Sequence, residues 1–91
     1  MKYEKIIKTL KKQDYDEVME YAGTVYAEKG LIIVSVNKEK WQIYRVTIKD
    51  FSQNIGYTNL CKTANEALDC IDEQVTVLLK TQGKNTQGGI R

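Results

Sequence analysis

The strongest constraint on the fold is a long amphipathic stripe in the C-terminal third of the sequence. Thr63 with Glu66 three residues later is the signature of a capping box at a helix start. Apolar residues then recur at spacings of three and four, namely Ala64, Ala67, Leu68, Ile71, Val75, Leu78 and Leu79. The pattern predicts a helix that runs to about Lys80, and such a helix must bury its apolar side against a second layer.

The second layer is predicted to be an antiparallel sheet. Residues 31–36 form an apolar run rich in β-branched side chains, which predicts a central strand buried on both faces or nearly so. Residues 41–49 and 55–61 alternate in polarity, as strands do when one face meets a core. Residues 24–27 are a further candidate strand, joined to the central one by a hairpin at Glu28-Lys29-Gly30 in which glycine supplies a positive φ.

The N-terminal part of the chain is predicted to be helical. Tyr3, Ile6, Ile7 and Leu10 form an apolar side, and lysines occupy the other side. Asp14 followed by Glu17 resembles another capping box, so residues 15–22 are predicted to form a second helical segment that ends at Gly23. The predicted fold is α+β: one or two helices, a three- to four-stranded antiparallel meander and a long C-terminal helix, packed as a two-layer sandwich.

The length of 91 residues suffices for one domain with one modest core. We expect this domain to span residues 1–80. Residues 81–91 are rich in Gln, Gly, Asn and Thr, which predicts a flexible tail whose removal leaves the fold intact. No stretch approaches the ~20 apolar residues of a membrane span, and the first residues lack the apolar run of a secretory signal, so we expect a cytoplasmic protein without a membrane partner. Cys61 and Cys70 are then expected to be reduced packing residues.

The charges are unevenly distributed along the chain, although the net charge is only +2. Two short segments, 14–20 and 66–73, hold eight of the 12 acids and no Lys or Arg. The rest of the chain carries all 14 bases against the remaining four acids. This pattern predicts separate positive and negative faces.

The residue types argue against catalysis. The chain has no histidine, and its carboxylates lie on segments predicted to be exposed, where nothing raises their pKa. No glycine-rich phosphate loop and no metal-ligand spacing is present in the sequence. The sequence therefore predicts a binding protein that is not an enzyme and uses no metal or cofactor.

Protein binding is the leading interpretation of the acidic segments. Early acids in a helix complement its dipole, but Glu73 lies too far from the helix start for that role. A stripe of like charges instead suits a basic partner. The predicted partner-binding residues are Asp14, Asp16, Glu17, Glu20, Glu66, Asp69 and Glu73.

Nucleic-acid binding is the alternative interpretation. The order of helix, three strands and helix is also that of double-stranded-RNA-binding domains, although the acids at the start of the last helix would repel phosphate. A basic helix side and a strand face with one tryptophan could neutralise and stack a nucleic acid. The residues of this alternative are Lys5, Lys8, Lys12, Trp41, Arg45 and Lys49.

Two stretches resemble a known family. Ile7-Lys8-Thr9-Leu10-Lys11-Lys12-Gln13-Asp14-Tyr15, and later Leu31-Ile32-Ile33 with Val36-Asn37, are similar to the first helix and first strand of small phage anti-CRISPR proteins. Those proteins occupy the DNA-binding groove of an RNA-guided nuclease, and they also have a helix, three strands and a helix in this order. The resemblance implies a phage or mobile-element product that binds and inhibits or modulates a host protein, such as a defence nuclease.

Self-association is a third interpretation, so the chain is expected to be a monomer or a homodimer. A hydrophobic strand such as residues 31–36 would favour dimers if it lay at a sheet edge.

Overall fold

The computed structural model describes the backbone of residues 3–90 and the side chains of residues 3–82. One five-stranded antiparallel sheet, with strands in chain order, is combined with two α-helices and one 3₁₀ turn. The elements are α1 (Glu4–Lys12), β1 (Glu17–Tyr21), β2 (Thr24–Lys29), β3 (Ile32–Lys38), η1 (Lys40–Gln42), β4 (Tyr44–Asp50), β5 (Ile55–Cys61) and α2 (Ala64–Ile90). The predicted α+β class is confirmed, with one strand more than the meander expected from the sequence.

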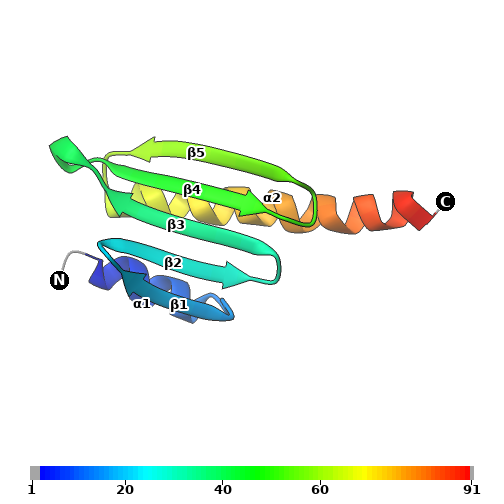
Figure 1. Cartoon of the computed structure of the whole chain (residues 1–91), viewed down its shortest axis with the longest axis horizontal. Helices are drawn as coiled ribbons and strands as arrows, with labels where there is room; N and C mark the ends of the chain where they lie inside the picture. The colour runs from blue at the N-terminus through cyan, green and yellow to red at the C-terminus, as the bar shows by residue number, and fades with distance from the viewer. Residues whose placement is uncertain (1–2, 91) are drawn as a thin grey trace.

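Both helices lie on the same side of the sheet (Figure 1). α1 packs on β1, whereas α2 packs on β3, β4 and β5 and extends beyond the end of the sheet. The sheet face that points toward the viewer in Figure 1 has no helix over it. The protein therefore has a covered sheet face and an open sheet face.

The hydrophobic core fills the space between the helices and the covered face. Alternate residues of the inner strands point into it, which is the period-two pattern expected of a sheet with one buried face. Ile6 and Leu10 of α1 and the preceding Tyr3 belong to it, and the Tyr3 hydroxyl also donates a hydrogen bond to the Gly23 carbonyl (2.7 Å). The other main contributors are Val25, Ala27, Ile32, Val34, Val36, Tyr44, Val46, Ile48, Ala67, Leu68, Ile71, Val75 and Leu78.

β3 is the middle strand of the five, as its apolar run predicted. The prediction that it is buried on both faces is only half right. Ile32, Val34 and Val36 are fully buried, whereas Ile33 and Ser35 are half-buried on the open face. The lack of polar alternation in the sequence therefore predicted more burial for this strand than the structure shows. Because β3 is central, self-association through its edge is excluded.

The segment 15–22 forms strand β1 and not the predicted helix. Ala22 and Gly23 both have positive φ (53° and 80°) and make the two-residue hairpin turn between β1 and β2. A glycine with positive φ serves equally as a helix stop or as part of such a turn, so Gly23 alone does not distinguish the two. Asp14 caps no helix: it lies in a turn with φ 60°, and the neighbouring Asp16 carboxylate accepts the Gly30 N–H (2.9 Å).

A hairpin joins β2 and β3 as predicted, with Gly30 at φ 61°, but its turn is Gly30-Leu31, because Glu28 and Lys29 belong to β2 and pair with β3. The capping box at the start of α2 is confirmed as well. The Thr63 hydroxyl accepts the Glu66 N–H (3.1 Å), and the Glu66 carboxylate accepts the Lys62 N–H (3.0 Å).

α2 continues to Ile90, past the end predicted near Lys80. The prediction of a flexible tail concerns residues 81–91, whose side chains lie outside the described residues except for Thr81 and Gln82, and it stays a prediction. No helix within residues 3–90 combines the length and the apolar character needed to cross a membrane.

Candidate functional site

The strand register fixes which side chains share the open face. Partners across each pair of strands point to the same side of a sheet, so they form continuous rows from β1 to β5. The first row is Glu17, Glu28, Ile33, Lys49 and Gly56; the second is Met19, Tyr26, Ser35, Thr47 and Thr58; the third is Tyr21, Thr24, Asn37, Arg45 and Leu60.

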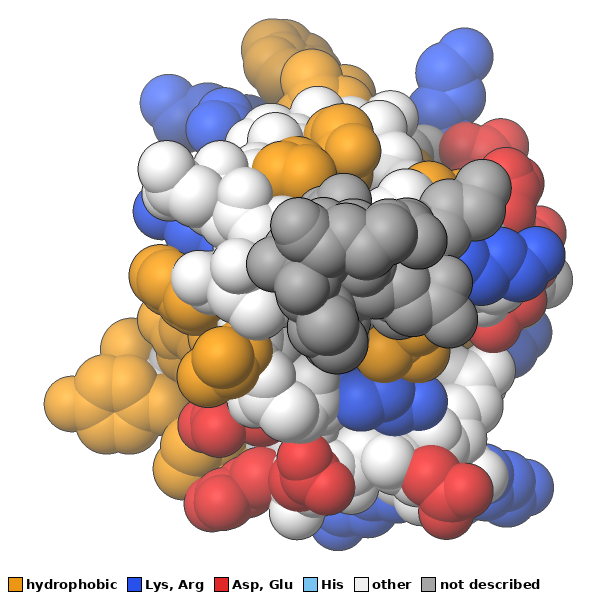
Figure 2. Space-filling model, turned by 90° about the vertical axis from the view of Figure 1, so that its right-hand side faces the viewer, with side chains coloured by type: hydrophobic (Ala, Val, Ile, Leu, Met, Phe, Trp, Pro, Cys, Tyr) orange, Lys and Arg blue, Asp and Glu red, His pale blue; other side chains and the backbone are white. Residues whose placement is uncertain are grey.

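Large hydrophobic side chains stand exposed on this face. The exposed fractions are 50% for Met19, 70% for Tyr21, 37% for Tyr26 and 64% for Leu60. Figure 2 views the molecule from the end at which α2 projects, so the open face lies on its left, where hydrophobic side chains gather. Single exposed apolar residues are ordinary, but four on one open sheet face, with Ile33 between them, indicate a contact surface.

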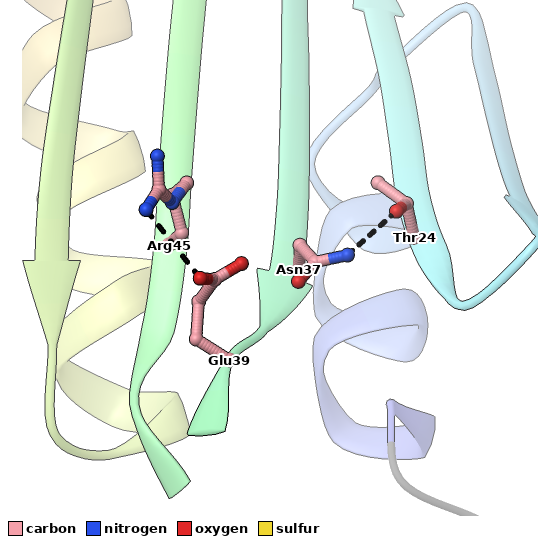
Figure 3. Close-up of polar contacts among 4 residues, drawn as sticks. All are labelled: Thr24, Asn37, Glu39 and Arg45. Carbon is pink, nitrogen blue, oxygen red and sulfur yellow. Dashed lines mark hydrogen bonds and ion pairs between the residues drawn. The ribbon is translucent and has the colours of Figure 1, made fainter. Parts of the chain in front are cut away.

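Polar contacts order the third row. Figure 3 shows that the Asn37 amide nitrogen donates to the Thr24 hydroxyl (2.9 Å) and that the Arg45 guanidinium pairs with the Glu39 carboxylate (3.4 Å). The ion pair is exposed, so it adds little stability, but it holds the guanidinium over the face. Arg45 is thereby fixed between the middle of the sheet and the turn that leads into β4.

That turn carries Trp41 at its tip. Trp41 and Gln42 both adopt left-handed backbone conformations, with φ of 66° and 62°. The Glu39 N–H donates to the Ile43 carbonyl (2.6 Å) and closes the loop between β3 and β4. Trp41 is 89% exposed, more than any other large hydrophobic side chain among the described residues. It lines a shallow hollow of about 370 Å³ together with Glu39, Lys40, Ile43, Arg45 and Leu60.

The structure separates the six residues of the nucleic-acid interpretation into two groups. Arg45 and Lys49 lie on the open face and Trp41 lies at its end, although in a turn and not at a strand start as predicted. Lys5, Lys8 and Lys12 lie on α1, behind the sheet. Lys8 is additionally paired with Glu4 (3.5 Å). A nucleic-acid strand that lies along the open face therefore does not meet the three lysines of α1.

The acids of segment 14–20 do not form one docking surface either. Glu17 lies on the open face, beside Glu28. Glu20 pairs with the buried Val25 and so points to the opposite side of β1. Asp14 and Asp16 belong to the turn between α1 and β1.

The acids of α2 are exposed but face different neighbours. Asp69 and Asp72 border a groove between the two helices whose other wall includes Lys5. Glu73 borders a hollow on the β5 side with Tyr57 and Val77. The basic and acidic segments therefore meet along the helix groove, and the two separate charged faces that the sequence predicted do not form there.

The perturbed titratable groups have structural roles. Burial, with the Asp72 carboxylate nearby, raises the pKa of Tyr15 to about 12, and the Lys29 ammonium lies 4.5 Å from the centre of its ring. Cys61 and Cys70 are free thiols. Burial raises the pKa of both, to about 11 for Cys70, and they share a hydrogen bond. Thiols with raised pKa are poor nucleophiles, which suits the packing role expected for them.

Asp50 at the end of β4 is the buried charged residue among the described side chains. Its carboxylate accepts hydrogen bonds from Ser52, Gln53 and Gln82. These contacts connect the β4–β5 turn to α2. Within residues 3–82, no cluster of three or more acids or cysteines is placed to hold a metal ion.

The exposed hydrophobic residues of the open face were not predicted from the sequence. Met19 and Tyr21 were assigned to a helix, so their alternation with Val18 was not used. Leu60 could have been identified from the sequence, because the alternation of β5 places it on the strand face that points away from the helices. Comparison with known proteins adds no further guide: no family model, curated protein or solved structure matches the chain.

Proposed function

We propose that the protein is a non-catalytic binding protein that docks another protein on its open sheet face, with Trp41 as the anchor. The observation that carries the proposal is the state of Trp41, which is 89% exposed in a backbone conformation that tryptophan does not favour. Tryptophan, tyrosine, methionine and arginine are the residue types enriched in protein interfaces and their hot spots. All four types occur together here, at Trp41, Tyr21, Tyr26, Met19 and Arg45.

Stability does not account for tryptophan at this position. Two successive residues with positive φ favour Asn-Gly in a hairpin turn, and each non-glycine residue in this conformation costs about 1–2 kcal/mol. Trp41 recovers little of that cost by packing, since nearly all of its side chain is in water. Strained residues of this kind cluster where a protein binds or reacts.

The charges of the face favour a protein partner over nucleic acid. Lys40, Arg45 and Lys49 are matched by Glu17, Glu28 and Glu39 along the same face and its end. A nucleic-acid surface needs an excess of positive charge to release counterions from the phosphates. A balanced rim around exposed aromatic residues is instead the usual anatomy of a protein interface.

The test replaces Trp41 and its neighbour separately. Trp41→Asn removes the anchor and relieves strain, so it should abolish partner capture while stabilising the fold by about 1 kcal/mol, or roughly 4–8 °C in Tm for a chain of this size. Gln42→Gly is the matched control, because it relieves strain in the same turn and keeps the tryptophan. It should gain similar stability and still capture the partner.

Capture is measured by pull-down from nuclease-treated bacterial lysate, and Tm by circular dichroism. Equal capture by Trp41→Asn and Gln42→Gly would contradict the proposal. So would capture that nuclease treatment abolishes, since that result would favour the nucleic-acid interpretation.

A second candidate function, with a different contact site, follows the anti-CRISPR resemblance: the partner is a host defence nuclease and the α2 acids are the contact. It is supported by the exposure of Glu66, Asp69 and Glu73, none of which has an ion-pair partner within the described side chains. If this candidate is right, reversing these three residues to Lys should abolish capture, whereas Trp41→Asn alone should leave capture unchanged.

Placement of the protein in the cytoplasm accords with the two free thiols.

A further inference from the structure

The two edges of the sheet are protected very differently. β1 is short, carries Glu17 and Glu20, and lies against α1. Such charges and coverings are the means by which proteins keep a sheet edge from pairing with another chain. β5 has seven residues, Ile55–Cys61, and contains no charged residue and no proline. In the described part of the chain it pairs with β4 alone, so its outer backbone groups are available to a further strand.

We propose that two copies of this chain pair through β5, edge to edge and antiparallel, and so form one continuous ten-stranded sheet. A two-fold axis through Thr58 brings all seven residues of the strand into register, because Thr58 is its middle residue. Thr58 then faces Thr58 of the second copy, Gly56 faces Leu60, Tyr57 faces Asn59, and Ile55 faces Cys61.

In this register the facing side chains of the two β5 strands are compatible in size and carry no charge. Leu60 is 64% exposed in the single chain, and the place opposite it is occupied by Gly56, which has no side chain to obstruct it. Threonine pairs directly opposite each other are favourable in antiparallel sheets. Because β5 has no charged residue, the two copies of the strand do not repel each other. A second copy therefore fits this edge without any change in the single chain.

The covered side of the same edge is also apolar. Tyr57 is 40% exposed and Val77 is 52% exposed, and both line the hollow of about 280 Å³ beside β5. Pairing of β5 with its copy sets these two hollows side by side under the joined sheet. The Trp41 turns stay uncovered, whereas Leu60 both lines the hollow beside Trp41 and faces the second copy, so the dimer and the proposed docking site adjoin at this residue.

The experiment measures mass by sedimentation equilibrium at protein concentrations up to about 1 mM. The unaltered chain should reach twice the 10.5 kDa of one copy. Thr58→Lys places two ammonium groups opposite each other on the axis and should raise the dissociation constant at least about 10-fold. Thr47→Lys is the matched control: it makes the same change in the same row, one strand away from the edge, and should leave the dimer unchanged.

Hydrogen exchange gives a second readout that needs no variant. Exchange of β5 amides in the unaltered chain should slow as protein concentration rises, whereas that of β1 amides should not. A monomer mass at all concentrations, a dimer that persists in Thr58→Lys, or equal loss of the dimer in Thr47→Lys would each overturn the proposal.

Discussion

Asp50 shows how a single buried charge is accommodated in this fold. Only 1% of the residue is exposed, and burial alone would raise the pKa of its carboxyl group. The hydrogen bonds from Ser52, Gln53 and Gln82 outweigh that effect and lower the pKa of Asp50 from 3.8 to about 2. The side chain therefore stays ionised and holds the β4–β5 turn against α2.

A lowered pKa makes a specific prediction for acid stability. Because the folded pKa lies below the unfolded one, the contribution of Asp50 is complete above pH ~4 and disappears as the pH falls through about 2. Asp50→Asn puts an amide opposite amide donors and should lower the unfolding free energy at pH 7 by about 1–3 kcal/mol. It should also remove part of the acid dependence of that free energy, as measured by urea unfolding.

The control for this change is Asp69→Asn, which alters an exposed carboxylate on α2. It should keep the acid dependence of the unaltered chain. An Asp50→Asn profile parallel to that of the unaltered chain between pH ~4 and ~2 would contradict the assigned role.

At the scale of elements, β3 separates the covered face from the open face. Val34 is fully buried, whereas its neighbour Ile33 is half-buried on the other side. Val34→Asp places an unpaired charge in the core and should abolish the cooperative thermal transition of a domain this small. Ile33→Asp should lower Tm but leave a cooperative transition, because its carboxylate can reach water.

Circular dichroism melting curves of the two variants provide the measurement. Since the same substitution is made at adjacent positions of one strand, the difference between the two melting curves reports which face of β3 is covered. Loss of folding in both variants would mean that β3 is buried on both sides, as the sequence pattern alone suggested.

At the scale of the whole molecule, elements that are specified by neighbouring residues could be predicted from the sequence, whereas elements that depend on tertiary contacts could not. The periodicity of α2, its capping box at Thr63 and the alternation of β5 are written in neighbouring residues, so these elements were predicted correctly. β1 was missed because Glu17–Tyr21 has a weak local preference and becomes a strand by pairing with β2.

The candidate site was harder to predict than the fold. Its members come from five strands and one turn, and only the register brings Tyr21, Arg45 and Leu60 into one row. The charged segments stood out in the sequence, but the fold distributes them over several surfaces. The packing of both helices on one side of the sheet was predicted correctly as a two-layer sandwich. The strand register, which decides which side chains share the open face, could not be read from the sequence.

The most direct test of the proposed docking face uses the single tryptophan of the chain as its reporter. Incorporation of 5-fluorotryptophan gives one fluorine NMR signal, which reports Trp41 alone even when the captured partner contains tryptophan of its own. In the free protein the signal should shift with solvent composition, as expected of an exposed ring. We predict that adding the captured partner shifts and broadens it and removes this solvent dependence. An unchanged, solvent-sensitive signal in a complex that has demonstrably formed would contradict the account.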